Sequence, residues 1–332
     1  MTRSTPAPLT LGIVGFGKIA RDQHVPAIAA TGLFRLAAVV SPHGGAPEEA
    51  GLSDVPVFRS QTEMLAALPG LDAVAICTPP AVRHALTVEA LRAGKHVLIE
   101  KPPAATLTEL RLLLDAAEGA KRTLFAAWHS RFNAAVEETR RRLAGATVRH
   151  AAITWKEDVR RWHPGQDWIF AAGGFGVFDP GINALSILTE ILPAPVVVRD
   201  AELRVPANRD TPIAATLRME GVAGSAVGTV TAAFDFLQQG EQTWTIAIET
   251  DGIGAEGIGA GGGRLDLTHG GTRLSVDGVP MLAEPDAEYQ GIYRRFHHLI
   301  ADAAGDVDAR PLQLVADACL VGRWRTTDAF HW

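Results

Sequence analysis

The chain has 332 residues, of which 47% are hydrophobic and 20% are charged, the balance of a folded protein with room for two domains. Its net charge of −6, from 31 basic and 37 acidic residues, argues against a nucleic-acid partner. The two cysteines suit a reducing compartment and no apolar run is long enough to span a bilayer, so we expect a cytoplasmic protein with no membrane partner.

The first predicted strand, Leu9 to Val14, leads directly into a glycine-rich turn. The turn has the G-x-G-x-x-A form of the dinucleotide fingerprint, and a predicted helix from Ile19 to Ala30 follows it. The first glycine permits the tight turn, and the second lets a pyrophosphate approach the backbone at the helix N-terminus. The pattern predicts cofactor contacts from Gly15, Gly17, Lys18 and Ile19.

The second predicted strand, Phe34 to Val40, ends in Ser41-Pro42-His43. A site specific for NAD usually has an Asp or Glu there to hold the ribose hydroxyls. Because no carboxylate follows this strand and Ser41 and His43 could hydrogen-bond a 2′-phosphate, the sequence favours NADP, with NAD also accepted.

The strand Ala73 to Cys77 and the helix Val82 to Ala93 continue the alternation of strands and helices. Thr78 and Pro79 follow the strand, so we expect them to lie at the same rim as the glycine turn and to contact the cofactor. His84 falls in the first turn of the helix, where it could contact the cofactor or simply face solvent.

The apolar run His96 to Ile99 predicts a strand buried on both faces, and it stops at Glu100-Lys101-Pro102-Pro103. Proline has no N–H to donate, so the strand cannot continue, and Lys101 stands at the carboxyl end of a parallel strand, where such sheets bind ligands. With a further helix after Thr106 and a strand to Ala127, the pattern predicts a doubly wound parallel (Rossmann) sheet in a domain of residues 1–128.

From about Trp128 the pattern changes. Several strands between Val148 and Val276, with helices at 134–143, 286–304 and 312–327, predict an α+β domain of residues 129–332. Its sheet should be large, open and mostly antiparallel, and the last helices should pack near the domain interface. No metal site is expected.

The segment from Lys156 to Trp168 is rich in both charged residues and tryptophan. Such a mixture suits sugar recognition, because aromatic rings cover C–H groups while polar groups bind hydroxyls; a surface loop with structural tryptophans is the alternative. Asp179 and Asn183 follow at a spacing of four, which places both on one helix face. Asp179 could instead cap that helix.

These motifs together resemble one oxidoreductase family. The G-x-G-x-x-A turn, Thr78-Pro79, Glu100-Lys101-Pro102 and the Gly-Gly…Asp179-x-x-x-Asn183 series are similar to those of the glucose-fructose oxidoreductase/inositol dehydrogenase (Gfo/Idh/MocA) family. Residues 155–165 and 178–187 resemble its L-arabinose/D-galactose 1-dehydrogenases, which oxidise an aldopyranose at C1 to the aldonolactone. Many family members have His where this chain has Asn183, and Asn matches the aldose 1-dehydrogenases.

The resemblance implies roles for particular residues. Lys101 and Asp179 would remove the C1 hydroxyl proton, and the owner of that proton stays open because Asn183 does not titrate. Asn183 would hold the sugar near C1. His129, Glu157, Trp162 and His163 would bind the other hydroxyls, and Glu100 would join Lys101 at the cofactor. A homo-oligomer, dimer or tetramer, through the C-terminal sheet is also implied.

Two other classes stay open. The first is another reaction of the same family, such as reduction of a keto-sugar or oxidation of an inositol. The second is a non-catalytic NADP-binding sugar sensor, which would have no need of both Lys101 and Asp179.

Overall fold

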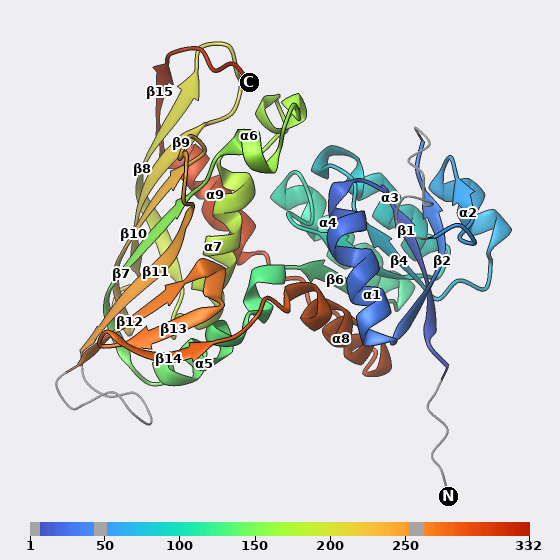
Figure 1. Ribbon diagram of the computed structural model, residues 1–332, viewed down its shortest axis with the longest axis horizontal. Coiled ribbons are helices and arrows are strands. Elements are labelled where there is room, and N and C mark those ends of the chain that lie inside the picture. The colour runs from blue at the N-terminus through green and yellow to red at the C-terminus, as the bar shows by residue number, and fades with distance from the viewer. Residues whose placement is uncertain (1–6, 43–51, 252–261) are drawn as a thin grey trace, which may run out of the picture. The chain divides into compact units, whose positions relative to one another are not determined.

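A computed structural model describes residues 7–42, 52–251 and 262–332 (Figure 1). His43, one of the residues predicted to contact the cofactor, lies outside these ranges. The chain divides into two compact units, Met1–Trp128 with Tyr289–Asp308 and His129–Glu288 with Ala309–Trp332. No helix of the described residues is long and apolar enough to cross a membrane.

The first unit is built on a sheet of six described strands in the order β3-β2-β1-β4-β5-β6, with every neighbouring pair parallel. This confirms the predicted Rossmann sheet. The order reverses between β1 and β4, the point at which open α/β sheets bind ligands. The elements are β1 (Leu9–Val14), α1 (Val25–Thr31), β2 (Phe34–Val40), β3 (Val57–Phe58), α2 (Gln61–Ala67), β4 (Ala73–Ile76), α3 (Pro80–Arg92), β5 (His96–Glu100), α4 (Leu107–Ala120) and β6 (Leu124–Ala127).

The helix after the glycine turn differs from the prediction of one regular helix from Ile19 to Ala30. A π-helical turn, Ala20–His24, comes first, and its cap N–H at Val25 donates to the Ala20 carbonyl five residues back. Pro26 has no N–H and cannot make the usual bond to the fourth residue before it, so the regular helix α1 begins only at Val25.

Residues 289–308, predicted to belong to the second domain, are part of the first unit. Their helix is α8 (Glu288–Ala301), which has a strongly aromatic buried side. The Phe296 ring stacks on Phe34 at 5.4 Å and on Phe125 at 6.2 Å, so apolar burial fixes the helix against this sheet. The order of elements along the chain does not reveal that residues 289–308 pack back into the first unit.

The second unit has nine described strands in the order β14-β13-β12-β11-β7-β10-β9-β8-β15. Only β7/β10 and β8/β15 are parallel within this described sheet, which confirms a large, mostly antiparallel sheet. The strands are β7 (Thr147–Lys156), β8 (Val196–Pro206), β9 (Ala214–Gly221), β10 (Val227–Asp235), β11 (Thr243–Asp251), β12 (Gly263–Thr268), β13 (Arg273–Val276), β14 (Val279–Ala283) and β15 (Arg323–Thr327).

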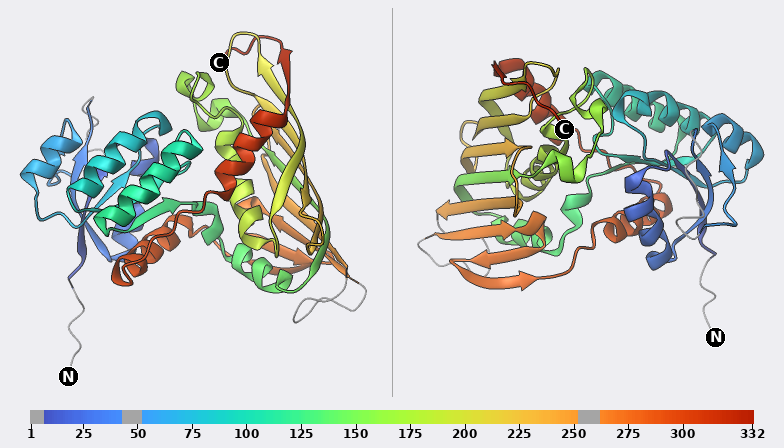
Figure 2. Two further views of the ribbon diagram at one scale, coloured as in Figure 1. Left: turned by 180° about the vertical axis from the view of Figure 1, so that it is seen from behind. Right: turned by 45° about the horizontal axis from the view of Figure 1, so that its top comes forward.

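Helices cover one face of this sheet (Figure 2). The apolar helix α7 is buried on nearly every side and forms the centre of the core of this unit. The helical elements are η3 (His129–Phe132), α5 (Ala134–Leu143), α6 (Val159–Trp162), η4 (Asp167–Phe170), α7 (Phe178–Ile191), η5 (His269–Gly271) and α9 (Arg310–Val321).

The prediction of a helix from Leu312 to Thr327 is wrong in its second part. Helix α9 ends at Val321, and Arg323–Thr327 form β15, which lies at one end of the described sheet and pairs in parallel with β8. At Gly322 a Cβ atom would lie 2.4 Å from the Ala318 carbonyl oxygen, so glycine permits the abrupt change of direction.

Candidate active site

The glycine turn leaves space for a ligand against the backbone. Gly15 has a φ of 91°, and a Cβ atom there would lie 2.9 Å from Cγ2 of Thr78. At Gly17 a Cβ atom would meet nothing within 4 Å. Lys18 and Ile19 are exposed at this turn, and the Lys18 ammonium pairs with Asp22.

Two polar atoms in the segment that follows β4 are buried without a hydrogen-bond partner among the described residues. They are Oγ1 of Thr78, just after β4, and Nε2 of His84, in the first turns of α3. Pro79 stands between strand and helix as the N-cap. Because a buried polar atom is costly unless satisfied, these atoms and the open glycine turn fit a dinucleotide. His84 is therefore not a plain surface histidine.

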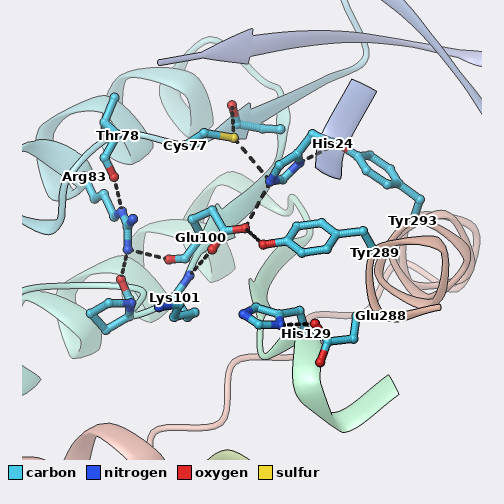
Figure 3. Close-up of polar contacts among 12 residues, drawn as sticks. His24, Cys77, Thr78, Arg83, Glu100, Lys101, His129, Glu288, Tyr289 and Tyr293 are labelled. Atoms are coloured by element: carbon cyan, nitrogen blue, oxygen red, sulfur yellow. Dashed lines mark hydrogen bonds and ion pairs between the residues drawn. The ribbon is translucent and has the colours of Figure 1, made fainter. Parts of the chain in front are cut away.

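The Glu100 side chain, at the end of β5, lies in a buried polar network that we call the Glu100 network: His24, Cys77, Glu100, Tyr289 and Tyr293. Oε1 of Glu100 accepts a hydrogen bond from the Tyr289 hydroxyl at 2.7 Å and lies 3.0 Å from Nε2 of His24. Figure 3 shows both tyrosines pointing from α8 toward His24 and Glu100. Oε2 accepts the backbone N–H of Lys101 at 2.9 Å, so the network fixes the residue that we expect to be catalytic.

Charges in the Glu100 network stabilise one another. Burial lowers the pKa of His24, but the neighbouring Cys77, Tyr293 and Glu100 groups raise it more, and the net pKa lies well above the ordinary value of 6.5. Burial raises the pKa of Tyr293 to about 12. The network therefore favours the protonated form of the His24 imidazole and the neutral form of the Tyr293 hydroxyl.

Arg83 clamps the backbone on both sides of Lys101. Its guanidinium donates to the Glu100 carbonyl at 2.7 Å, to the Pro102 carbonyl and to the Thr78 carbonyl at 2.7 Å. The peptide bond between Lys101 and Pro102 is cis. No local sequence pattern predicts this role, because Arg83 has the position of an ordinary charged residue on a helix surface.

In the second unit, α7 places Asp179 and Asn183 on one face. Asp179 is buried in the first turn of the helix, where the helix dipole favours a carboxylate, and does not occupy the N-cap position considered as an alternative. Its Oδ2 lies 3.3 Å from Nε2 of His163. Asn183 follows one turn later, and its side-chain amide makes no hydrogen bond to the described residues.

A buried carboxylate lies next to two tryptophans at the end of β7. Oε2 of Glu157 accepts from Nε1 of Trp244 at 3.0 Å, and the Trp162 and Trp244 rings lie 5.6 Å apart. Nε1 of Trp162 is buried with no acceptor among the described residues. The prediction missed Trp244; an aromatic residue among the polar residues of β11 was the available signal.

His129 is oriented by a carboxylate that the prediction also missed. Its Nδ1 lies 2.6 Å from Oε2 of Glu288, and Asn133 donates to Oε1 of that carboxylate at 2.8 Å. Burial raises the pKa of Glu288, but the contacts with His129, Ser130 and Asn133 outweigh it and hold the pKa below its usual range. Because Glu288 stays ionised, Nδ1 of His129 is the nitrogen that carries the proton.

Comparison with known proteins places the chain in a family. Residues 9–127 match the Gfo/Idh/MocA model, described as an oxidoreductase family with an NAD-binding Rossmann fold. A galactose 1-dehydrogenase from Pseudomonas fluorescens is 45% identical over 327 residues, 98% of this chain and 99% of that protein. The chain belongs to the Gfo/Idh/MocA oxidoreductase family. This confirms the resemblance drawn from its motifs and the prediction of an oxidoreductase.

Solved structures agree. The crystal structure of a D-galactose-1-dehydrogenase from Rhizobium etli is 45% identical, with a TM-score of 0.89 over 99% of this chain and 100% of that one. A 3-ketoreductase from Actinomadura kijaniata, solved with NADP and TDP-benzene, has a TM-score of 0.78 at 18% identity, covering 96% and 99% of the two chains. The second likeness supports the fold alone.

Proposed function

We propose that this protein is an aldose 1-dehydrogenase, which oxidises pyranoses of the D-galactose and L-arabinose type at C1 to the aldonolactone. The observation that carries the proposal is the arrangement in the second unit, where His163 lies 3.3 Å from Asp179 and Asn183 follows Asp179 by one turn of α7. The 45% identity to galactose 1-dehydrogenase over nearly the whole chain supports the same function.

In this proposal Lys101 and Asp179 act on the C1 hydroxyl of one sugar molecule. The pair takes up the hydroxyl proton on whichever group is unprotonated, while Asn183 holds the sugar near C1 and the ring oxygen. A bound nicotinamide dinucleotide supplies the hydride acceptor. Arg83 and Glu100 keep the backbone of Lys101 in place, so its ammonium needs little reorganisation before the reaction.

The remaining hydroxyls fall to the polar groups of the second unit. We assign them to Glu157, Trp162, His163 and His129, with the Trp162 N–H supplying a donor that lacks an acceptor within the described protein. A sugar hydroxyl would satisfy that donor and recover the cost of burying it. D-Galactose and L-arabinose share their C2 to C4 configuration, so a site without a contact to C6 accepts both.

We propose NADP as the preferred coenzyme, with NAD also accepted. The described residues after β2 are Ser41 and Pro42, and neither is the carboxylate that usually holds the ribose hydroxyls of NAD. Comparing kcat/KM for the two coenzymes tests the assignment, and a clear preference for NAD would overturn it.

We also propose a dimer or tetramer formed through the open face of the nine-stranded sheet. The residues at its centre have small side chains that leave this face flat, and in register they are Ala247, Ala152, Thr231, Thr245, Thr154 and Ala233. A flat face of this kind lets a second sheet approach closely. A monomeric mass by light scattering at micromolar concentration would contradict the proposal.

The test of the function is a substrate panel. D-Galactose and L-arabinose with NADP or NAD should give reduced coenzyme, detected by its absorbance. Methyl β-D-galactopyranoside is the matched control, because its C1 oxygen is blocked while its other hydroxyls are unchanged. Turnover of that glycoside, or of myo-inositol in place of aldoses, would indicate another reaction of the family. Sugar binding without turnover would indicate a sensor.

A further inference from the structure

The residues after β15 are fixed against the end of the nine-stranded sheet. The Asn208 side chain makes two hydrogen bonds with the backbone of Phe330, donating to its carbonyl and accepting its N–H, both at 2.9 Å. The Phe330 ring is only 5% exposed. We call residues Phe330–Trp332 the terminal anchor.

The terminal anchor contacts the segment that bears the proposed sugar-binding residues. Arg160 of α6 donates to the His331 carbonyl at 3.1 Å, and its guanidinium lies 4.8 Å from the centre of the Phe330 ring. Nε1 of Trp332 donates to Oδ1 of Asp167 at 2.7 Å, and Arg209 donates to the same oxygen at 2.9 Å. The anchor therefore contacts both helical turns of residues 158–170.

A chain of ring contacts leads from the terminal anchor to the candidate catalytic carboxylate. Phe330 lies 5.2 Å from Phe170, which lies 6.1 Å from Phe236. The Phe236 ring lies 6.0 Å from His163, and His163 in turn contacts Asp179 at 3.3 Å. Packed rings transmit displacement because protein interiors are dense.

We propose that the terminal anchor is a positioning element for the proposed sugar site, holding residues 158–170 so that Trp162 and His163 meet the substrate. The helical turns it contacts, α6 and η4, have four residues each. Helices this short are unstable by themselves, so tertiary contacts must fix their orientation. The inference rests on the proposed function.

Phe330→Ala is the first test. We expect KM for D-galactose to rise by about tenfold, because small displacements of binding groups are costly, while kcat changes less and the Kd of the coenzyme stays the same. Hydrogen exchange of the amides in residues 158–170 should become faster, while that of the β7 and β10 amides should not. Asp328→Ala, an exposed change two residues before the anchor, is the matched control and should leave both quantities unchanged.

Arg160→Ala is the second variant, because removal of a partly exposed side chain cannot disrupt the core. It should raise KM in the same direction, with Arg160→Lys partly restoring it. Unchanged KM and unchanged exchange in both Phe330→Ala and Arg160→Ala would overturn the proposal. The exchange measurement does not depend on the substrate. If the wild-type protein oxidises no aldose, the proposed function fails, while faster exchange still establishes the positioning.

Discussion

The Glu100 network and the cluster around Glu157 are both built on a buried carboxylate, but they differ in how completely their partners are satisfied. In the first, His24 and Tyr289 hold Oε1 of Glu100, and Oε2 holds the backbone of Lys101. In the second, Trp244 donates to Glu157, whereas the adjacent Trp162 keeps a buried N–H with no acceptor among the described residues.

The difference indicates that the two clusters have different roles, one in rigid support and the other in ligand binding. A satisfied buried network makes a rigid support, and its neighbour Lys101 needs a fixed position. A buried donor without an acceptor destabilises the free protein, and a ligand hydroxyl removes that cost. We therefore expect changes in the Glu100 network to appear in stability and catalysis, and changes near Trp162 to appear in sugar binding.

Lys101→Ala should have the largest effect. Loss of the ammonium should lower kcat by about a thousandfold, the scale of a positioned proton-transfer group, with the Kd of the coenzyme little changed. Steady-state kinetics and coenzyme titration measure both. Lys121→Ala, at an exposed lysine after α4, serves as the control and should keep normal turnover. Near-normal kcat in Lys101→Ala would reject the catalytic role.

Tyr289→Phe tests whether the Glu100 network stabilises the fold. It removes one hydroxyl whose proton is donated to a buried carboxylate, which should lower the free energy of unfolding by about 2 kcal/mol in urea titrations. Thr87→Val is the matched control, because it deletes a buried hydroxyl that has no partner among the described residues. That change should be neutral or stabilising; an equal loss in both variants would contradict a specific role for the network.

Trp162→Phe tests whether the cluster around Glu157 binds the sugar. It deletes the N–H but keeps an aromatic ring, so KM for D-galactose should rise by about fivefold, the value of one hydrogen bond, while the free energy of unfolding should not fall. Trp168→Phe is the control, because the Trp168 N–H already donates to Gln166. If Trp162→Phe has the same KM as the wild-type protein, the Trp162 N–H does not contact the sugar.

The smallest expected effect is a difference in pH dependence. His24 has a raised pKa in the folded protein, so its contribution to stability is complete below about pH 6.5 and is lost as the pH rises through the folded value. The slope is at most about 1.4 kcal/mol per pH unit. His24→Gln should flatten this alkaline slope. Because Cys77, Glu100, Tyr289 and Tyr293 all face His24, their variants serve as comparisons.

Glu288 should behave in the opposite way. Its pKa is lowered from 4.5, so its contribution is present above that pH and is lost as the pH falls through the folded value. His129→Ala should reduce this acid-side loss. Measuring the free energy of unfolding from pH 3 to pH 9 gives both slopes. If the alkaline slope persists in His24→Gln, a group other than His24 causes that slope.

Local signals predicted much of the fold. Capping sequences mark the start of two helices: the Ser60 side chain accepts the Glu63 N–H before α2, and the Thr106 side chain accepts the Glu109 N–H before α4. Strand β15 and the return of α8 to the first unit were missed, because each depends on partners more than a hundred residues away. Periodicity carries no information about such partners.

The residues of the candidate site also fall into two groups, those that short motifs predict and those that only the fold reveals. Lys101, Asp179 and Asn183 stand in short motifs, so the sequence was enough to select them. Their supports come from distant positions: Tyr289 is 189 residues from Glu100, Trp244 is 87 from Glu157, and Glu288 is 159 from His129. Only folding brings these pairs together, and no local pattern marks the supporting residue.

Oxidation at C1 is the central claim, and galactose deuterated at C1 tests it most directly. Our account predicts that the deuterium leaves the sugar and is found in the reduced coenzyme, that the product is the galactonolactone, and that the rate with the deuterated sugar is lower. Deuterium retained at C1 of an oxidised product, measured by mass spectrometry, would place the reaction at another carbon and contradict the account.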